Sequence, residues 1–393
     1  MSESSQISNL KSQISVGIIG SGTMGIGIAQ VAATNNYKVF LYDQNSSQTE
    51  KSLEGLQKVL DRLVEKNKIG FEESENIYNR IKFCTELKDL KDCDLVIEAI
   101  IENKEIKQKV FADLEEIVSN DCVLATNTSS ISITSISADL KNSERFLGIH
   151  FFNPAPLMPL VEIIPGLLTA ENLPQKIYDL MKSWGKIPVI AQDIPGFIVN
   201  RIARPFYGEA LRIVEEKIAT PAQVDEAMRT IGNFKMGPFE LMDLIGIDIN
   251  FAVTETVYKD YFYDPKYKPS LLQHRMSEAK LLGRKIGKGF YDYSDASQDS
   301  RNKNQDNKDE KLFNEIFLRI ISMLINEAVE AKRLKLASDE DLELAMQKGV
   351  NYPKGLLAWG KEIGYKKVSE TLQNLYETYQ EERYRQSPLL RKM

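Results

Sequence analysis

The sequence is poor in the residues that build metal sites and disulfide frameworks. It contains only three cysteines, Cys84, Cys93 and Cys122, and two histidines, His150 and His274. The cysteines form no CxxC pair and their number is odd, so we expect neither a zinc site nor a set of disulfides. We therefore expect no metal, and a reducing cytosol fits the chain best.

Long apolar runs and an excess of positive charge are also missing. No run approaches the roughly 18 apolar residues of a membrane span, and residues 1–13 are polar, without the apolar core of a signal peptide. We expect residues 1–13 to be a disordered arm and the membrane not to be a partner. The formal net charge of -6 disfavours a general surface for nucleic acid, although it allows a local basic patch for one phosphorylated ligand.

The first part of the sequence has the pattern of a dinucleotide-binding fold. An apolar, β-branched run at 14–19 ends in Gly20-Ser-Gly22-Thr-Met-Gly25, and a helical stretch begins at Met24. In such a turn the first glycine permits the tight bend, the second lets a pyrophosphate approach the backbone, and the third lets helix and strand pack closely. The helix N-terminus favours the phosphate charge. A glycine turn that binds nothing is the alternative.

The next expected strand favours NAD as the cofactor. This strand, at 37–42, ends in Asp43, where a carboxylate can accept hydrogen bonds from both hydroxyls of the adenosine ribose. Residues 44–46 contain no arginine or lysine that would receive a 2′-phosphate. The pattern therefore selects NAD over NADP.

Strand and helix patterns then alternate. Further strands are expected at 81–84, 95–100, 123–126, 146–151 and 161–164. This alternation predicts an α/β Rossmann-type dinucleotide-binding domain over 14–194, with a doubly wound and mostly parallel sheet. The charged segment between Asn45 and Arg80 predicts one or two amphipathic helices inserted between strands.

Helical periodicity replaces the strands from Pro195 onward. Helices at 201–216 and 221–231 predict a first all-α domain over 195–293, and the polar stretch 294–311 predicts a flexible linker. Helices resume at Leu312 and predict a second all-α domain over 312–393. With 393 residues, of which 42% are hydrophobic, the chain is long enough for several domains of the usual size.

The two helical domains contain an internal repeat. Residues 209–246 align without a gap on residues 327–364: Glu-Ala opens both segments, Ala-Met recurs in both, and Ile-Gly closes both. A constant offset through the whole segment indicates a duplicated helical module. At the same offset the counterpart of Asn200 is Leu318. We therefore expect the second copy to be degenerate, to have a structural role and to pack against the first.

His150 is the candidate for proton transfer. Oxidation of a hydroxyl needs a base that takes the O–H proton while hydride leaves carbon, and histidine is the natural choice. His150 ends an expected strand in Gly148-Ile-His-Phe-Phe-Asn-Pro, and ligands of open parallel sheets bind beyond the carboxyl ends of the strands. Taken alone, the pattern fits a core histidine equally well. His274 lies in a polar helical stretch, so we expect it at the surface.

A series of ordered motifs between about Ile14 and Tyr293 closely resembles the L-3-hydroxyacyl-CoA dehydrogenases. These motifs are residues 20–30, Asn127-Thr-Ser-Ser, His150-Phe-Phe-Asn-Pro, Leu160-Val-Glu, Asp193-Ile-Pro-Gly-Phe-Ile-Val-Asn-Arg, Met236-Gly-Pro-Phe-Glu and Gly287-Lys-Gly-Phe-Tyr. The resemblance implies reversible, NAD-dependent oxidation of a short (S)-3-hydroxyacyl-CoA, such as 3-hydroxybutyryl-CoA, to the 3-oxoacyl-CoA. It also implies an acyl-CoA substrate and a place in fatty-acid metabolism, as in β-oxidation.

The resemblance also implies roles for single residues. His150 is the implied acid/base, and Glu162 the implied acceptor of a hydrogen bond from its other ring nitrogen. The implied substrate-binding residues are Ser129, Asn153, Asn200 and Lys58. The implied cofactor-binding residues are Gly20, Gly22, Thr23, Met24, Gly25, Asp43, Glu102, Lys107, Asn127, Ser129 and Asn153.

Simpler interpretations stay open for several of these residues. Glu162 could be a solvated carboxylate at a strand edge, Ser129 and Asn200 ordinary turn residues, and Lys58 a solvated lysine. Two family positions of opposite charge also suggest a pair between Glu102 and Arg201.

The resemblance bears on quaternary structure too. Shorter members of the family pair their helical domains in a homodimer, whereas a second copy can satisfy the same apolar face within one chain. We therefore expect a monomer or a weak homodimer with one active site per chain.

Two other functions stay open. A dehydrogenase of a free hydroxy acid or sugar acid shares the framework of His, Glu and Asn. A non-catalytic NAD-binding structural protein on the same fold is the second, because a fold does not settle function.

Overall fold

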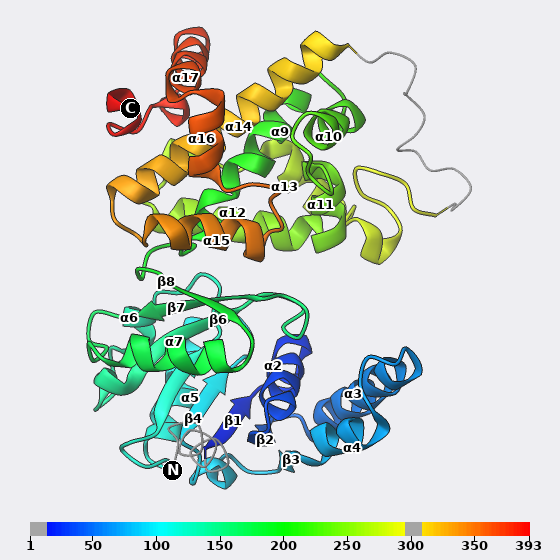
Figure 1. Cartoon of the computed structure of the whole chain (residues 1–393), viewed down its shortest axis with the longest axis vertical. Coiled ribbons are helices and arrows are strands. Elements are labelled where there is room, and N and C mark those ends of the chain that lie inside the picture. The colour runs from blue at the N-terminus through cyan, green and yellow to red at the C-terminus, as the bar shows by residue number, and fades with distance from the viewer. Residues whose placement is uncertain (1–13, 295–308) are drawn as a thin grey trace, which may run out of the picture. The chain divides into compact units, whose positions relative to one another are not determined.

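The computed structural model describes residues 14–294 and 309–393 (Figure 1). The expected arm at 1–13 and nearly all of the expected linker at 294–311 lie outside the described residues. The chain divides into two compact units, Met1–Ile194 and Pro195–Met393. The predicted fold class, a Rossmann-type α/β domain followed by helical domains, is confirmed. Over the described ranges, no helix combines the length and apolar character of a membrane span.

The first unit is built on one eight-stranded sheet with the order β3-β2-β1-β4-β5-β6-β7-β8. Its described strands pair in parallel, except that β6 and β7 are antiparallel. The strands are β1 (Ser15–Ile19), β2 (Lys38–Tyr42), β3 (Ile81–Cys84), β4 (Leu95–Glu98), β5 (Val123–Thr126), β6 (Phe146–Phe151), β7 (Leu160–Pro165) and β8 (Ile187–Ile190). The sequence pattern did not predict β8, because its proline argues against a strand interior. Proline is tolerated here because β8 lies at the edge of the sheet.

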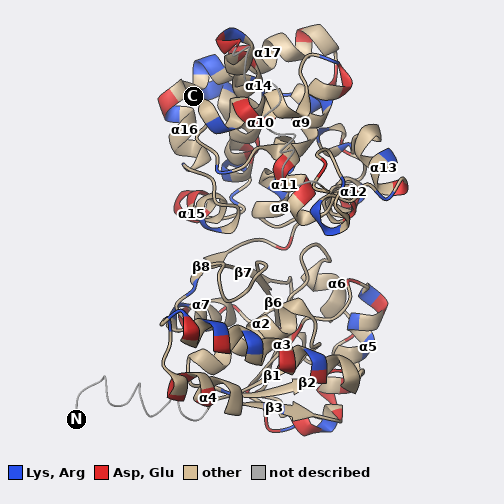
Figure 2. Ribbon diagram, turned by 90° about the vertical axis from the view of Figure 1, so that its right-hand side faces the viewer, with Lys and Arg blue, Asp and Glu red and all other residues tan. Residues whose placement is uncertain are grey.

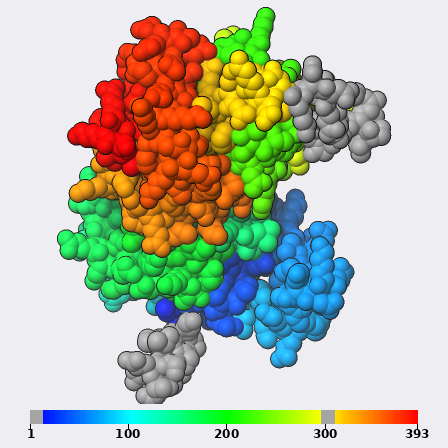
Figure 3. Space-filling model, turned by 45° about the horizontal axis from the view of Figure 1, so that its top comes forward, coloured from blue at the N-terminus to red at the C-terminus, as the bar shows by residue number. Residues whose placement is uncertain are grey.

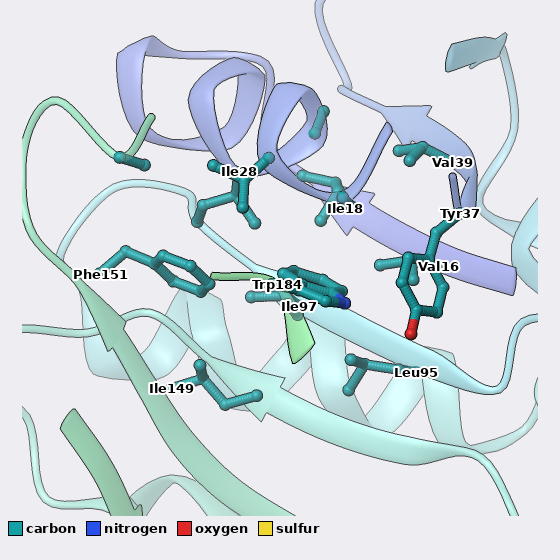
Figure 4. Close-up of a cluster of buried hydrophobic side chains, with 14 of the residues drawn as sticks. Val16, Ile18, Ile28, Tyr37, Val39, Leu95, Ile97, Ile149, Phe151 and Trp184 are labelled. Atoms are coloured by element: carbon teal, nitrogen blue, oxygen red, sulfur yellow. The ribbon is translucent and has the colours of Figure 1, made fainter. Parts of the chain in front are cut away.

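Helices cover both faces of this sheet. They are α2 (Thr23–Thr34), α3 (Ser46–Glu65), α4 (Phe71–Asn79), α5 (Lys104–Glu115), α6 (Ile133–Ser137) and α7 (Leu173–Ser183). One face packs with α2, α3, α4 and α7 in a single apolar cluster, part of which is drawn in Figure 4. In that view Ile28 of α2 and Trp184 lie over Ile18 and Ile97 of the sheet. Acidic and basic positions alternate on the outer turns of the flanking helices (Figure 2).

The alternation of side chains along β6 and β7 decides which residues point into this apolar cluster and which point to the opposite face of the sheet. Ile149 and Phe151 of β6 belong to the cluster, as do Val161 and Ile163 of β7. Successive side chains of a strand point to opposite faces, so the residues between them point to the other face, where α5 and α6 pack. His150 and Glu162 are such residues.

The second unit contains the two helical modules. The first consists of α8 (Val199–Ile202), α9 (Arg204–Glu215), α10 (Pro221–Thr230), α11 (Pro238–Ile245), α12 (Ile247–Asp260) and α13 (Leu271–Glu278). The second consists of α14 (Glu310–Arg333), α15 (Asp339–Gly349), α16 (Leu356–Ile363) and α17 (Tyr365–Tyr379). Helix α14 packs against α9 and α10 of the first module. Figure 3 shows the orange and red atoms of the later helices beside the yellow atoms of α14.

Equivalent contacts recur in the two modules at the offset of the sequence repeat. The Asp225 carboxylate accepts hydrogen bonds from two backbone N–H groups at the start of α11, those of Phe239 and Glu240, both at 2.9 Å. Its counterpart Glu343 accepts from the first turn of α16 at 2.7 and 3.0 Å. The same carboxylate therefore anchors the same helix start in both modules.

One helix of the first module departs from the prediction. A continuous helix was expected at 201–216, but the chain breaks at Ala203, between α8 and α9. Pro205 has no N–H to donate to the carbonyl of Arg201, which is one cause of the break. The counterpart of Pro205 is Met323, and α14 runs through it without interruption.

Candidate active site

The glycine turn lies at the carboxyl end of β1, between β2 and β4 in the sheet. Gly20 has a positive φ of 99°, and a Cβ built on it would lie 2.6 Å from the carbonyl oxygen of Ala99. A Cβ on Gly25 would lie 1.8 Å from the carbonyl oxygen of Gly20. In contrast, apart from Gly22 itself and its two chain neighbours, no described atom lies within 4 Å of a Cβ built on Gly22. A side chain at Gly20 or Gly25 would therefore collide with the protein's own backbone. The surface beside Gly22 is open, so a ligand can approach the backbone there.

The helix that follows starts without a side-chain cap. Helix α2 begins at Thr23, and its N-cap residue Gly22 provides no side-chain hydrogen bond in the described structure. Thr23 is exposed and Met24 is half-buried. The N–H groups of this first turn can serve an anionic ligand, because the positive end of the helix dipole lies there.

Asp43 closes the same site from the end of β2. Its Oδ2 accepts hydrogen bonds from the backbone N and the Oγ of Ser21 at 2.7 and 2.9 Å, and its Oδ1 accepts from the backbone N of Asn45 at 2.8 Å. The aspartate is half-buried. The carboxylate is thus held against the glycine turn, at the strand end where the sequence placed the ribose contact.

His150 and Glu162 face one another across the antiparallel pair β6 and β7. They are direct register partners, and Nδ1 of His150 lies 2.7 Å from Oε2 of Glu162. Glu162 is 0% exposed and His150 is 6% exposed. A buried carboxylate needs a polar partner, and the imidazole supplies one here. The geometry therefore has the form of a histidine oriented by a carboxylate.

The loop after β5 is tied to its neighbours by hydrogen bonds. The Asn127 Oδ1 accepts from the backbone N of Phe151 at 2.8 Å, which joins the ends of β5 and β6. The backbone N of Ser129 donates to Glu102 at 3.0 Å. Asn127 and Ser129 are both half-buried. These contacts bring Asn127 and Ser129 to the same edge of the sheet as His150.

Three charged residues support this loop: Glu98 and Lys107, which are buried, and Glu102, which is exposed. Lys107 is 1% exposed, and its ammonium lies 2.6 Å from Glu98 and 3.3 Å from Glu102. Burial acts to raise the pKa of Glu102, but Lys107 and the hydrogen bonds from Thr128 and Ser129 lower it below its usual value. Glu102 is therefore a carboxylate that holds the loop by accepting its hydrogen bonds, and the ammonium of Lys107 stabilises the charge of this carboxylate.

The structure places the remaining predicted residues separately. Asn153 is exposed in the loop after β6, and Lys58 is exposed on α3. Asn200 belongs to the second unit, on the single turn of α8. Its neighbour Arg201, expected to pair with Glu102, pairs within that unit with Glu327. His274 is half-exposed on α13 and stacks on Phe251, as expected of a surface residue.

Sequence reasoning missed a lysine that holds the loop following His150. Lys186 is 8% exposed, and its ammonium donates to the carbonyl oxygens of Ala155 and Met158, the latter at 2.9 Å. Burial lowers the pKa of this lysine to about 8. Nothing in the local pattern signals such a lysine, because its acceptors are main-chain groups of a distant loop. The three cysteines are buried and free.

The second module has no amide at the position of Asn200. Its counterpart Leu318 lines a cavity of about 380 Å³ between α9, α14 and α17, together with apolar residues such as Ile213 and Leu375. None of the predicted site residues lines this cavity. The second copy therefore differs from the first where the first carries its predicted substrate contact.

Comparisons with known proteins cover both units. The family model described as 3-hydroxyacyl-CoA dehydrogenase, NAD binding domain, matches residues 15–194. The model described as 3-hydroxyacyl-CoA dehydrogenase, C-terminal domain, matches residues 196–293 and again 316–393.

Similar relatives include both long and short chains. A 3-hydroxyadipyl-CoA dehydrogenase of Escherichia coli is 37% identical over 96% of each chain. A probable 3-hydroxybutyryl-CoA dehydrogenase of Deinococcus radiodurans is 42% identical over 70% of this chain and 99% of its own length. A crystal structure of a 3-hydroxybutyryl-CoA dehydrogenase from Escherichia coli, 35% identical, matches with a TM-score of 0.90 and covers 96% of this chain and 98% of the other.

Proposed function

Because the chain belongs to the 3-hydroxyacyl-CoA dehydrogenase family, we propose that His150 is the acid/base of its reaction and that Glu162 orients it. The chain is an oxidoreductase that acts on a CH–OH group and uses NAD. The observation that carries the proposal is the buried 2.7 Å contact between His150 Nδ1 and Glu162 Oε2, at the sheet edge that also carries the glycine turn.

The proposed chemistry assigns one proton to His150. With Nδ1 donating to Glu162, Nε2 takes the proton of the substrate hydroxyl, and the buried carboxylate stabilises the imidazolium that forms. NAD, when bound, supplies the hydride acceptor. In the reverse direction the same Nε2 returns the proton to the oxygen of the 3-oxo group.

The cofactor is held by residues that fit it. The N–H groups after Gly22 would bind the pyrophosphate, because the space beside Gly22 is open, and Asp43, which Ser21 already orients, would accept hydrogen bonds from the adenosine ribose. Asn127 and Ser129 lie in the loop that follows β5, and this loop would contact the nicotinamide ribose.

We propose a short (S)-3-hydroxyacyl-CoA as the substrate, with Ser129, Asn153 and Asn200 contacting its oxygen-bearing region. Relatives that match this chain are named for two acyl groups, 3-hydroxybutyryl and 3-hydroxyadipyl, and the second is longer by a CH2 group that carries a terminal carboxylate. Lys58 stays a proposed contact for the phosphates of coenzyme A, supported only by its place on the exposed side of α3.

We propose a monomer or weak homodimer, supported by the packing of α14 on α9 and α10 within one chain. An obligate dimer joined through residues 195–246, found by equilibrium sedimentation, would contradict this. Three buried free thiols support a reducing cytoplasm as the location.

One assay tests the proposed activity. The purified chain is mixed with NADH and acetoacetyl-CoA, 3-oxoadipyl-CoA or a free 3-keto acid, and absorbance at the NADH band is followed. We expect consumption with a CoA thioester and none with the free acid. Consumption with the free acid alone would favour a hydroxy-acid dehydrogenase, and no consumption with any of them would favour a non-catalytic protein.

A further inference from the structure

Two buried ion pairs join the helical modules, and the repeat relates them to each other. Arg201 of the first module pairs with Glu327 of the second, with Nε and Oε2 3.5 Å apart. Arg319 of the second module pairs with Glu209 of the first, with Nε and Oε1 2.6 Å apart. At the offset of the repeat Arg201 corresponds to Arg319 and Glu209 to Glu327. The arginine of each module therefore binds the glutamate of the other.

Tyrosines complete each pair in the same way. The guanidinium of Arg201 lies 5.2 Å from the ring centroid of Tyr261, and that of Arg319 lies 5.1 Å from the ring centroid of Tyr379. The hydroxyl of Tyr267 donates to Glu327 at 2.8 Å, and that of Tyr384 donates to Glu209 at 2.9 Å. The four charged residues are at most 8% exposed. The two clusters are thus near copies in composition and burial.

The clusters differ in their extra charges. Lys266 adds a second cation to Glu327 at 2.5 Å. Glu216 adds a second carboxylate to Arg319 at 2.9 Å. Loss of Glu327 therefore leaves two buried cations, whereas loss of Glu209 leaves Arg319 with a carboxylate.

The clusters support very different helices. Arg319 lies in the middle of α14, a helix of 24 residues that is held by its own backbone hydrogen bonds. Arg201 lies on α8, a helix of 4 residues. Gly196 and Phe197, with positive φ of 76° and 47°, precede this turn, and the break at Ala203 follows it. A helix this short has little stability of its own and depends on tertiary contacts.

Side chains supply those contacts to α8. Arg204 donates from Nε to the carbonyl oxygen of Asn200 at 2.8 Å, from within the first module. Arg201 reaches Glu327 on α14, and α14 and α15 of the second module both pack on α8. The second module therefore holds the turn that presents Asn200.

We infer that Glu327 of the second module is a positioning residue for Asn200, acting through Arg201, so that the degenerate copy contributes to substrate binding. The inference rests on the proposed function, in which Asn200 contacts the acyl-CoA. Glu209 is the matched control. It forms the equivalent buried pair with Arg319, whose neighbour in the sequence is Leu318, and no substrate contact is proposed for Leu318.

The test compares Glu327→Gln and Glu209→Gln in the full chain. Both variants are assayed with NADH and acetoacetyl-CoA, and NADH titration counts the folded sites. We expect E327Q to lower kcat/KM for acetoacetyl-CoA at least about tenfold, mainly through KM, because a displacement of about 1 Å is costly at a reacting centre. The KM for NADH should not change. E209Q should leave both KM values unchanged, even where its thermal midpoint falls.

A double-mutant cycle with Asn200→Ala separates positioning from loss of stability. We expect E327Q to have no further effect on kcat/KM in the N200A background, whereas independent effects would add. Equal losses in E327Q and E209Q, or additive effects of E327Q and N200A, would overturn the inference. If E327Q does not fold, Glu327→Asp and Glu209→Asp, which keep the charge, carry the same comparison. Absence of turnover in the unmodified chain would instead overturn the proposed function.

Discussion

Replacing Glu162 with glutamine tests the proposed proton-transfer pair with the smallest change of shape. Glutamine keeps the volume of the side chain but removes its charge. Its amide N–H can also donate to Nδ1 of His150, which favours the tautomer with the proton on Nε2. An imidazole in that tautomer cannot accept the proton of the substrate hydroxyl, so we expect kcat to fall.

The structure sets the size of this loss. Glu162 is fully buried and 2.7 Å from the ring, so the contact counts as a hydrogen bond to a charged group, worth about 1.5 to 3 kcal/mol. Because about 1.4 kcal/mol is a tenfold change in rate, the lost bond alone lowers kcat about 10- to 150-fold. The wrong tautomer costs about 10⁴ in the Ser-His-Asp triad when its aspartate becomes asparagine. We therefore expect a fall of about 10² to 10⁴.

The assay is NADH consumption with acetoacetyl-CoA, alongside NADH binding measured by fluorescence. NADH affinity should not change, since neither His150 nor Glu162 belongs to the glycine turn. His150→Gln serves as the reference, and we expect the double variant H150Q/E162Q to be no slower than H150Q alone, because residues that act as a unit are not additive.

Two results would refute the reasoning. A kcat of E162Q within about threefold of the unmodified chain would show that the buried contact does not serve the reaction. Additive losses in H150Q and E162Q would show that Glu162 acts on something other than His150.

The glycine turn, Asp43 and Glu327 give three further predictions. Gly22→Ala should leave the thermal midpoint unchanged and weaken NAD binding, whereas Gly25→Ala should lower the midpoint, since only the second Cβ meets the chain; calorimetry and NAD titration separate them. Asp43→Ala should weaken NAD binding about 10- to 150-fold, whereas Asp94→Ala, which removes a similar pair of hydrogen bonds to Ser15, should leave titrated NAD affinity unchanged. Burial acts to raise the pKa of Glu327, but Lys266, Arg201 and hydrogen bonds from Lys266 and Tyr267 lower it to about 2. The stability from this lowered pKa is present above about pH 4.5 and is lost as the pH falls to about 2, so E327Q should lose about 3 kcal/mol less of its free energy of unfolding over that interval in denaturant titrations.

The second module changes how duplication in this chain is understood. Leucine at position 318, where the first module has Asn200, suggests a purely structural copy. Glu327 of this copy nevertheless forms an ion pair with Arg201, the residue next to Asn200. A copy that has lost a substrate contact can still support the contact of its twin, because the pairing of the modules is reciprocal. Truncation after Tyr293 would therefore remove a support of α8 as well as an apolar cover.

Local patterns in the sequence determined most of the first unit. Apolar, β-branched runs placed the strands, because a strand buried on both faces must be apolar along its length. The glycine spacing and Asp43 predicted the cofactor turn, because each glycine answers a different steric demand within a few residues. Local patterns failed at β8, where a proline interrupts the apolar run, and at the break between α8 and α9.

Pairing between distant segments was decided only by the tertiary structure. His150 and Glu162 meet because β7 runs antiparallel to β6 in a register that puts them opposite each other. Lys107 lies beneath Glu98 and Glu102, and Arg201 meets a glutamate 126 residues away. The sequence shows that these charged residues exist, and the repeat shows that Arg201 and Arg319 occupy equivalent positions. Which carboxylate a buried cation binds depends on how helices and strands pack. A periodic pattern of a few residues cannot predict a contact between residues that lie far apart in the sequence.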